Sequence, residues 1–152
     1  MHEVFMDMAL DQARQAEAAG EVPVGAVIVD REGIVIASGF NQPISIKDPT
    51  AHAEIIAMRR AAEGVSNYRL SGLSLYCTME PCSMCAGAMV HARIQKLIFG
   101  AADPRAGAAG SIYNILRDSR LNHQVEVVSG VRERECREIV QNFFEAKRNA
   151  RL

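Results

Sequence analysis

Residues 73–91 read LSLYCTMEPCSMCAGAMVH, and they join a strand-forming segment directly to a helix-forming one. The pattern predicts a strand over Leu73–Thr78 and a buried helix over Cys82–His91. Because side chains three residues apart share one face of a helix, Cys82 and Cys85 can bind one ion from the first helical turn without distorting the backbone. This pair of cysteines is the starting point for interpreting the rest of the chain.

A CxxC pair alone has several interpretations: a redox pair, half of a structural zinc site, a chance spacing or a catalytic zinc site. The sequence His-Ala-Glu at 52–54 and a proline directly before the first cysteine favour the last of these. Catalytic zinc takes three ligands from imidazole and thiolate groups and leaves a fourth position for water, whose pKa the metal lowers. We therefore predict that His52, Cys82 and Cys85 hold one Zn²⁺ per chain.

Glu54 is predicted to transfer protons rather than to bind the metal. Residues two apart do not share a helix face, so Glu54 is poorly placed to be a ligand beside His52. Two helix N-termini that converge on the metal would favour the thiolate forms of the cysteines. The competing interpretation is a non-catalytic scaffold with structural zinc, but such a site gains nothing from an adjacent acid and normally closes its fourth position.

The remaining elements follow from periodicity and from turn residues. We predict an α/β layer sandwich with a five-stranded mixed sheet. The last two strands are too far apart in sequence for a tight hairpin, so a crossover should make them parallel. The second helix should be capped by Thr50, which puts His52 in its first turn. The other predicted elements are helices over Glu3–Ala19, Ala51–Ala62 and Arg132–Arg148, a short helix near Ser111–Leu116, a hairpin of Gly25–Val29 and Ile34–Ser38, and strands over Lys96–Gly100 and Gln124–Val128.

Length and composition limit the alternatives. A chain of 152 residues, with 49% hydrophobic and 23% charged residues, is expected to form a single globular domain, 1–152. Acidic residues in the first 20 positions argue against a secretory signal, and no run is long enough to span a bilayer, so we expect a cytoplasmic protein without a membrane partner. The net charge of -1 counts mildly against a nucleic-acid substrate. Cys77 and Cys136 are expected in the core, and His2, His91 and His123 in structural or exposed positions.

His52-Ala53-Glu54 followed by Pro81-Cys82-Ser83-Met84-Cys85 resembles the signature of the cytidine and adenosine deaminase superfamily. Further segments resemble the bacterial tRNA-specific adenosine deaminase family, and the similarity covers nearly the whole chain. These segments are EVPVGA at 21–26, DPTAHAE at 48–54, NYRL at 67–70, Asp103-Pro104-Arg105 and GAAGS at 107–111. Arg105 stands where many relatives have lysine, and Ala102 where some have arginine.

The resemblance implies a cytidine-deaminase-like three-layer α/β/α fold, a homodimer, and conversion of the wobble adenosine in an arginine tRNA anticodon loop to inosine. A zinc-activated water would attack C6 of adenine while Glu54 moves the protons. By family position, Asn41 would hydrogen-bond the nucleoside and Val24 would pack against it. Asp103 would face the ribose of the preceding nucleotide, where a carboxylate can accept from a 2′-hydroxyl.

Two further substrate contacts are implied in the last helix, where Phe144 would stack on a base and Arg148 would meet phosphates. Two of the substrate contacts, and the phenylalanine next to Phe144, also have structural interpretations. Asn41 would form a turn beside Pro43, Asp103 would be a solvated turn residue, and Phe143 would belong to the core.

A deaminase of a free base or nucleoside, such as cytosine, cytidine or guanine, is the alternative function, because the superfamily shares the zinc motif across these substrates. The parallel fifth strand and the basic, aromatic last helix favour a polynucleotide.

Overall fold

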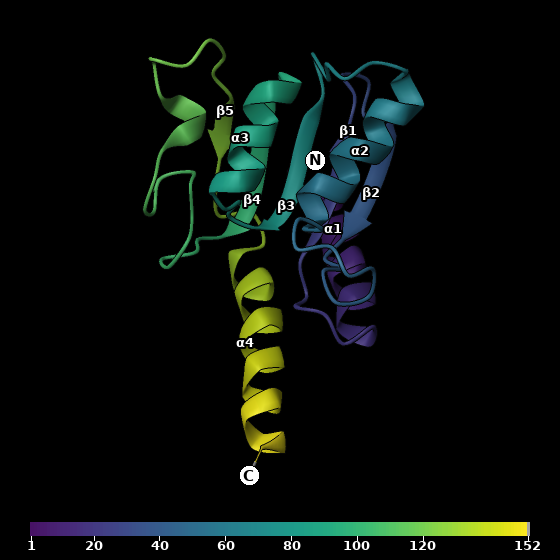
Figure 1. Ribbon diagram of the computed structural model, residues 1–152, viewed down its shortest axis with the longest axis vertical. Helices are drawn as coiled ribbons and strands as arrows, with labels where there is room; N and C mark the ends of the chain where they lie inside the picture. The colour runs from purple at the N-terminus through teal and green to yellow at the C-terminus, as the bar shows by residue number, and fades with distance from the viewer. Residues whose placement is uncertain (152) are drawn as a thin grey trace.

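The computed structural model describes residues 1–151, which form a mixed sheet with helices on both faces (Figure 1). Its five strands are β1 (Gly25–Val29), β2 (Val35–Phe40), β3 (Ser74–Met79), β4 (Lys96–Ala101) and β5 (Glu126–Val128). In space they follow the order β2-β1-β3-β4-β5. β1 is antiparallel to β2 and β3, whereas β4 is parallel to β3 and β5. The predicted mixed sheet and the parallel crossover to the last strand are both confirmed.

The helices are α1 (His2–Ala18), α2 (Ala53–Val65), α3 (Ser83–Ala92), the short 3-10 helix η1 (Ile115–Arg117) and α4 (Glu133–Ala150). Residues of α2, α3 and η1 share one hydrophobic core on one face of the sheet, and residues of α1 and α4 share another on the opposite face. The fold is therefore the predicted three-layer α/β/α sandwich. Within residues 1–151, none of the helices is both long enough and apolar enough to cross a bilayer.

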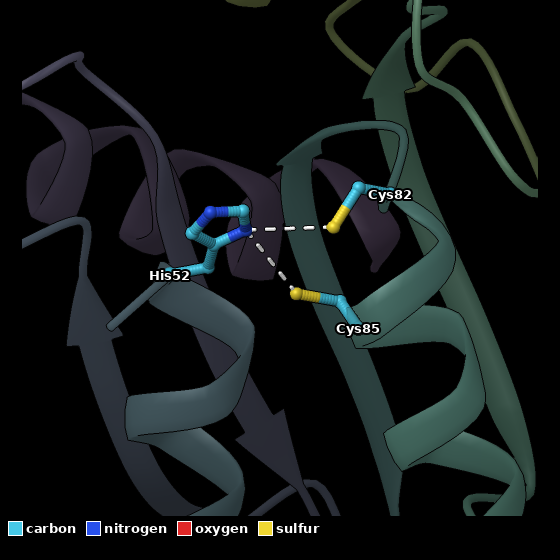
Figure 2. Close-up of side chains that lie close together, drawn as sticks. All are labelled: His52, Cys82 and Cys85. Atoms are coloured by element: carbon cyan, nitrogen blue, oxygen red, sulfur yellow. Dashed lines mark hydrogen bonds between the residues drawn. The ribbon is translucent and has the colours of Figure 1, made fainter. Parts of the chain in front are cut away.

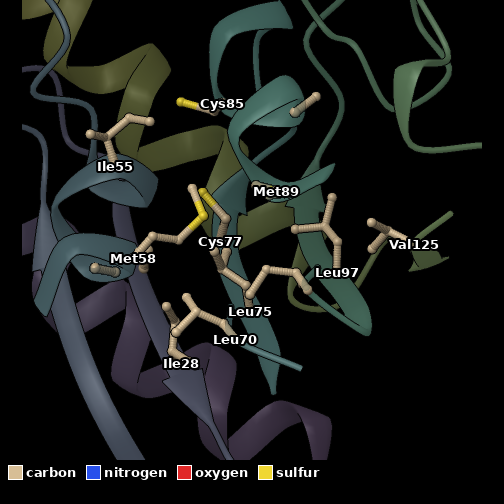
Figure 3. Packing of buried hydrophobic residues seen from close by; sticks show 14 of the residues in the cluster. Ile28, Ile55, Met58, Leu70, Leu75, Cys77, Cys85, Met89, Leu97 and Val125 are labelled. Carbon is tan, nitrogen blue, oxygen red and sulfur yellow. The ribbon is translucent and has the colours of Figure 1, made fainter. Parts of the chain in front are cut away.

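The strands supply both cores because successive side chains point to opposite faces of a sheet. In β4, Leu97 and Phe99 belong to the core beneath α2 and α3, whereas Ile98 between them belongs to the core beneath α1 and α4. Figure 3 shows the first of these cores, with Cys85 and Ile55 at the end nearest the start of α3. Cys85, one of the predicted metal ligands, is thus anchored in the packed interior.

A glycine in β4 lets α4 approach the sheet closely. A Cβ atom added at Gly100 would overlap the side chain of Cys136, which is fully buried at the beginning of α4. Beyond this contact α4 contributes no other fully buried residue, and its C-terminal half runs past the strands (Figure 1). The last helix is therefore anchored at one end only.

The predicted cap of the second helix is wrong. α2 begins at Ala53, and His52 occupies the N-cap position in an extended conformation instead of lying in the first turn. The hydroxyl and the backbone N–H of Thr50 both donate hydrogen bonds to Asp48 Oδ1, at 2.7 and 2.8 Å. Asp48 therefore competes successfully for the hydroxyl that was expected to cap the helix. Cys82 is likewise the N-cap of α3 rather than a residue of its first turn.

The short helix predicted near Ser111–Leu116 is present only in part, because η1 covers just Ile115–Arg117. The segment before η1 pairs its backbone groups within its own loop, where Gly110 N donates to Tyr113 O and Ile112 N donates to Gly107 O. A short helix would have had to break these bonds. The predicted hairpin is present. Its second strand ends at Phe40, two residues after the predicted Ser38.

Cysteines and histidines outside the expected metal site have structural or exposed positions, as predicted. Cys77 and Cys136 are fully buried. His2 Nδ1 lies 2.6 Å from the Tyr76 hydroxyl, and His123 Nε2 donates to the carbonyl of Ile94 at 2.8 Å. His91 is exposed on α3.

Candidate active site

The predicted metal ligands meet where two helices begin (Figure 2). His52 precedes α2, Cys82 precedes α3, and Cys85 lies in the first turn of α3. The imidazole points toward both sulfur atoms, and its Nδ1 lies 3.5 Å from each of them. The three ligand atoms all lie within 4.8 Å of one another. The structure thus brings together residues that are 30 and 33 positions apart in the sequence.

This spacing fits a tetrahedral metal centre. With Zn–N and Zn–S distances of about 2.05 and 2.3 Å, tetrahedral geometry places nitrogen and sulfur about 3.6 Å apart. The observed separations of 3.5 Å from His52 Nδ1 agree with that value. One imidazole and two thiols are also the donor set of catalytic zinc, which leaves the fourth position to water. The group can therefore hold Zn²⁺, with His52 coordinating through Nδ1.

The electrostatics of the three ligands favour a cation. A hydrogen bond from the Cys85 thiol, together with one from His52, lowers the pKa of Cys82 to about 3. The shared proton stays on Cys85, whose pKa is raised by its hydrogen bond to Cys82 and by burial. Both thiols lie at the start of α3, where the partial positive charge of the helix favours the thiolate. A divalent cation would displace the remaining proton and take both sulfur atoms.

Glu54 lies beside this ligand group without joining it. Its side chain is only 4% exposed, and burial raises the pKa of its carboxyl group. It lines the same pocket as His52 and Cys82, although it is absent from the group of residues that could hold a metal. A buried acid of raised pKa, next to a metal-bound water, can accept and return protons near neutral pH.

The pocket above the ligand group has a volume of about 290 Å³. This is close to the lower end of the range for small-molecule sites, about 300–1,000 Å³, and suits one base better than a larger ligand. Four of the five predicted substrate contacts line it, and Arg148 does not. The lining residues are Val22, Val24, Asn41, His52, Glu54, Met79, Glu80, Cys82, Asp103, Val140 and Phe144.

Arg148 instead lines a larger groove of about 810 Å³ between α4 and the loop that follows β4. The groove and the pocket share four residues, namely Met79, Asp103, Val140 and Phe144. Phe144 is 44% exposed at this junction. Two more guanidinium groups, those of Arg105 and Arg137, line the groove. One nucleotide of a chain could therefore enter the pocket while the neighbouring nucleotides lie in the groove.

The structural interpretations of the predicted contacts have different outcomes. Asp103 does form a turn, because its Oδ1 accepts from the backbone N–H groups of Arg105 and Ala106 at 3.0 and 3.3 Å, yet it also lines the pocket. The Asn41 side chain makes no hydrogen bond within residues 1–151, so the expected turn is absent. Phe143 is half-buried against Phe144 and lies outside both cores, which corrects its assignment to the core.

Glu80 is a pocket residue to which the sequence pattern assigned no role. It is 4% exposed, and its carboxylate accepts hydrogen bonds from the loop that carries Asp103. An acidic residue between a buried strand and Pro81 was the available signal, because a charge in such a position needs partners.

Known proteins match this chain along nearly its whole length. The family described as MafB19-like deaminase matches residues 1–148. A tRNA-specific adenosine deaminase of Haemophilus influenzae is 50% identical over 146 residues, which cover 96% of this chain and 84% of that protein. A solved structure of a tRNA:A34 deaminase, studied for A-to-I editing at the wobble position of transfer RNA, is 45% identical with a TM-score of 0.85, covering 89% and 97% of the two chains.

Guanine deaminase from Bacillus subtilis is a more distant structural match. It is 40% identical with a TM-score of 0.65, covering 72% of this chain and 70% of that one. Both the identity and the coverage favour the first group of relatives over this one. Because it is 50% identical to a tRNA-specific adenosine deaminase over 146 residues, and carries a His/Cys/Cys group beside a buried glutamate on a three-layer α/β/α fold, this chain belongs to the tRNA-specific adenosine deaminase family.

Proposed function

We propose that this chain is a zinc-dependent hydrolase that converts adenosine to inosine at the wobble position of a tRNA anticodon loop. The observation that carries the proposal is the arrangement of His52, Cys82, Cys85 and the buried Glu54 around a pocket for one base. The relatives named as tRNA-specific adenosine deaminases support the choice of substrate.

His52, Cys82 and Cys85 would hold the ion, which when bound supplies a water of lowered pKa as the nucleophile for C6 of adenine. Glu54 takes a proton from that water and passes it to N1 of the base. It would then take the remaining proton of the hydroxyl group added at C6 and deliver it to the amino group. As the C–N bond breaks the C6 carbonyl forms, so that water and adenosine give inosine and ammonia. Its raised pKa suits both directions of transfer.

The base must leave its stack to reach Glu54, which costs little in a single-stranded loop. We assign Val24 and Asn41 to the base, because both line the pocket beside the ligand group. Asp103 would accept from the ribose 2′-hydroxyl of the preceding nucleotide. Phe144 would stack on a base at the junction of pocket and groove, and Arg148 would meet a phosphate in the groove.

A deaminase of a free base is the second candidate, and the likeness to a guanine deaminase supports it. The groove of about 810 Å³ favours the polymer, because a free base would fill the smaller pocket and leave the groove and its arginines without a ligand.

Incubation with total tRNA, and separately with free guanine, cytidine and adenosine, distinguishes the two candidates. We expect adenosine-to-guanosine changes at the wobble base when the treated tRNA is sequenced. An arginine tRNA is the expected target. Ammonia from guanine or cytidine with unchanged tRNA would reject the proposal in favour of the free-base enzyme.

We also propose that the enzyme acts as a homodimer. The segment before and after η1 exposes large apolar side chains, which a second subunit could cover: Ile112, Tyr113 and Leu121 are 52%, 54% and 40% exposed. Sedimentation equilibrium should give a mass near twice the 16.6 kDa of one chain. A monomeric mass at micromolar concentration would contradict this.

A further inference from the structure

Glu80 is a buried carboxylate whose hydrogen bonds all come from one distant loop. It lies between the end of β3 and Pro81, and Pro81 is followed by Cys82, one of the proposed metal ligands. Its Oε1 accepts from the backbone N–H of Asp103 at 2.9 Å and from the Ser111 hydroxyl. Its Oε2 accepts from the backbone N–H groups of Ala109 and Ser111 at 2.9 and 3.1 Å. Each oxygen therefore has two donors.

These four donors belong to both ends of the loop over residues 102–111, which is otherwise irregular. Asp103 lies at its beginning, and Ala109 and Ser111 lie at its end, so one carboxylate closes the loop on itself. The backbone of the same short segment adds two more links, because Glu80 N donates to Ala101 O and Ala108 N donates to Pro81 O, both at 2.8 Å. Hydrogen bonds to an ionised carboxylate are about twice as strong as neutral ones.

The middle of the loop is fitted to the same group. Gly107 is buried against the Glu80 carboxylate, and a Cβ atom at Gly107 would overlap it. The loop therefore covers most of the carboxylate, which is 4% exposed, and an uncompensated charge at this depth would be costly. Within residues 1–151, no cation pairs with Glu80, so the loop is what makes its burial tolerable.

We propose that Glu80 is a positioning residue that holds the 102–111 loop against the metal-binding segment and so fixes Asp103 at the rim of the substrate pocket. The inference rests on the proposed function insofar as Asp103 is assigned to the ribose. Glu80, Asp103 and Phe144 all line the pocket, so a shift of the loop would move the rim that meets the polynucleotide. The residues that would bind the metal and those that would select the substrate are thereby linked through Glu80 and Cys82, which are separated only by Pro81.

Two other roles fit Glu80 less well. It does not belong to the group of residues that could hold a metal, which consists of His52, Cys82 and Cys85. It is also unsuited to proton transfer, because both of its oxygens already accept two hydrogen bonds from the loop. Glu54 beside the ligands has no comparable set of donors within residues 1–151.

Limited proteolysis tests the anchor without any assay of activity. Arg105 is exposed on the loop, so trypsin can cleave after it once the loop is released. Glu80→Gln puts an amide N–H₂ against N–H donors and should speed cleavage at this bond about tenfold or more, because the amide cannot accept from all four donors. Ser111→Ala, which removes one donor and keeps the carboxylate, should give a smaller increase. Glu63→Gln, an exposed change on α2, should be cleaved by trypsin at the same rate as the wild type.

Cleavage of folded Glu80→Gln and Ser111→Ala at the wild-type rate would overturn the proposal. Should Glu80→Gln fail to fold, Ser111→Ala alone decides between the outcomes, because its hydroxyl bonds only to Glu80 within residues 1–151. Circular dichroism establishes folding, and metal analysis should show equal zinc in all variants.

A double-mutant cycle tests the link to Asp103 on an anticodon stem-loop. Glu80→Gln should raise KM about tenfold while kcat stays within about threefold, since the metal site and Glu54 are unchanged. Adding Asp103→Ala should raise KM little further. Independent, multiplicative effects would overturn the proposal. If the wild type leaves RNA unchanged, the proposed function fails instead, and the proteolysis result still judges the anchor.

Discussion

At the scale of single residues, Glu54 and the ligands beside it should be separable by mutation. Glu54→Gln keeps the shape of the side chain but cannot transfer protons, so we expect a loss of kcat of about 10²–10⁴-fold with zinc and fold retained. Cys82→Ala should lose both zinc and activity, because it removes one of three ligands. Inosine formation and metal analysis on the same samples measure the two effects. Activity of Glu54→Gln within tenfold of wild type would refute its role.

Glu21 offers a prediction about pH. The group is 1% exposed, and although burial raises its pKa, hydrogen bonds from the Ser45 hydroxyl and from the backbone of Ser45 and Ile44 lower it below 4.5 overall. A lowered pKa in the folded state stabilises the protein above pH 4.5, and this stabilisation is lost as the pH falls through the folded value. The carboxylate thus stabilises the loop after β2 most strongly at neutral pH.

Glu21→Gln should therefore lower the free energy of unfolding by about 1–3 kcal/mol at pH 7. The difference from the wild type should shrink as the pH falls below 4.5. Urea unfolding at several pH values measures both quantities. A difference that is constant across this range would show that the charge of Glu21 is not what stabilises the loop.

At the scale of elements, the docking of α4 depends on the absence of a side chain in β4. Gly100→Ala would drive a methyl group into Cys136, so we expect a loss of about 1–3 kcal/mol from overpacking. Gly64→Ala is the matched control, because nothing lies within 4 Å of the added Cβ and alanine is favoured in a helix by about 0.5–1 kcal/mol. In thermal unfolding, Gly100→Ala should have a lower melting temperature than the wild type and Gly64→Ala a higher one. Equal shifts would contradict the close approach.

The elements show which features a sequence can predict. Strand and helix identities were predictable because they depend on local periodicity, and the ligands were predictable because metal chemistry demands particular residue types at particular spacing. The cap of α2 was not, because Thr50 has two available partners and only the folded turn shows that Asp48 wins. The short helix expected near Ser111–Leu116 forms only at Ile115–Arg117, because the loop before it pairs its own backbone groups.

The site shows the same limit. Val24, Asn41, Asp103 and Phe144 were placed at the pocket by family resemblance, and the structure brings them there. The role of Glu80 could not be predicted because its partners are 23 to 31 residues away in the chain, and no local pattern predicts such contacts. Long-range hydrogen bonding therefore separates what composition and spacing reveal from what the fold alone can show.

At the scale of the whole molecule, both cores share one sheet, so the chain should behave as a single domain. Strands such as β4 contribute to the two cores at once, so loss of either core would expose one apolar face of the sheet on which the other core depends. We expect one cooperative unfolding transition in urea, with coincident changes in circular dichroism and tyrosine fluorescence. Two separate transitions would show that the layers unfold independently.

The groove is slightly more basic than the chain as a whole, whose net charge is -1, because three arginines line it against two acidic residues, Asp103 and Glu145. If Arg148 meets one phosphate, Arg148→Ala should weaken RNA binding and reduce the slope of log K against log salt by about 0.7. Filter binding of an anticodon stem-loop across a range of salt concentrations measures the slope. An unchanged slope would remove Arg148 from the interface, and unchanged thermal stability would confirm that the variant is folded.

The one-sided anchoring of α4 bears on how this enzyme can change. Since Cys136 is the only buried residue of that helix, substitutions in its outer turns cost the rest of the protein little. Selection could thus change the part that we propose to contact neighbouring nucleotides, while folding and chemistry stay intact. New preferences for loop sequence should accordingly arise first in those turns, far sooner than in the two cores.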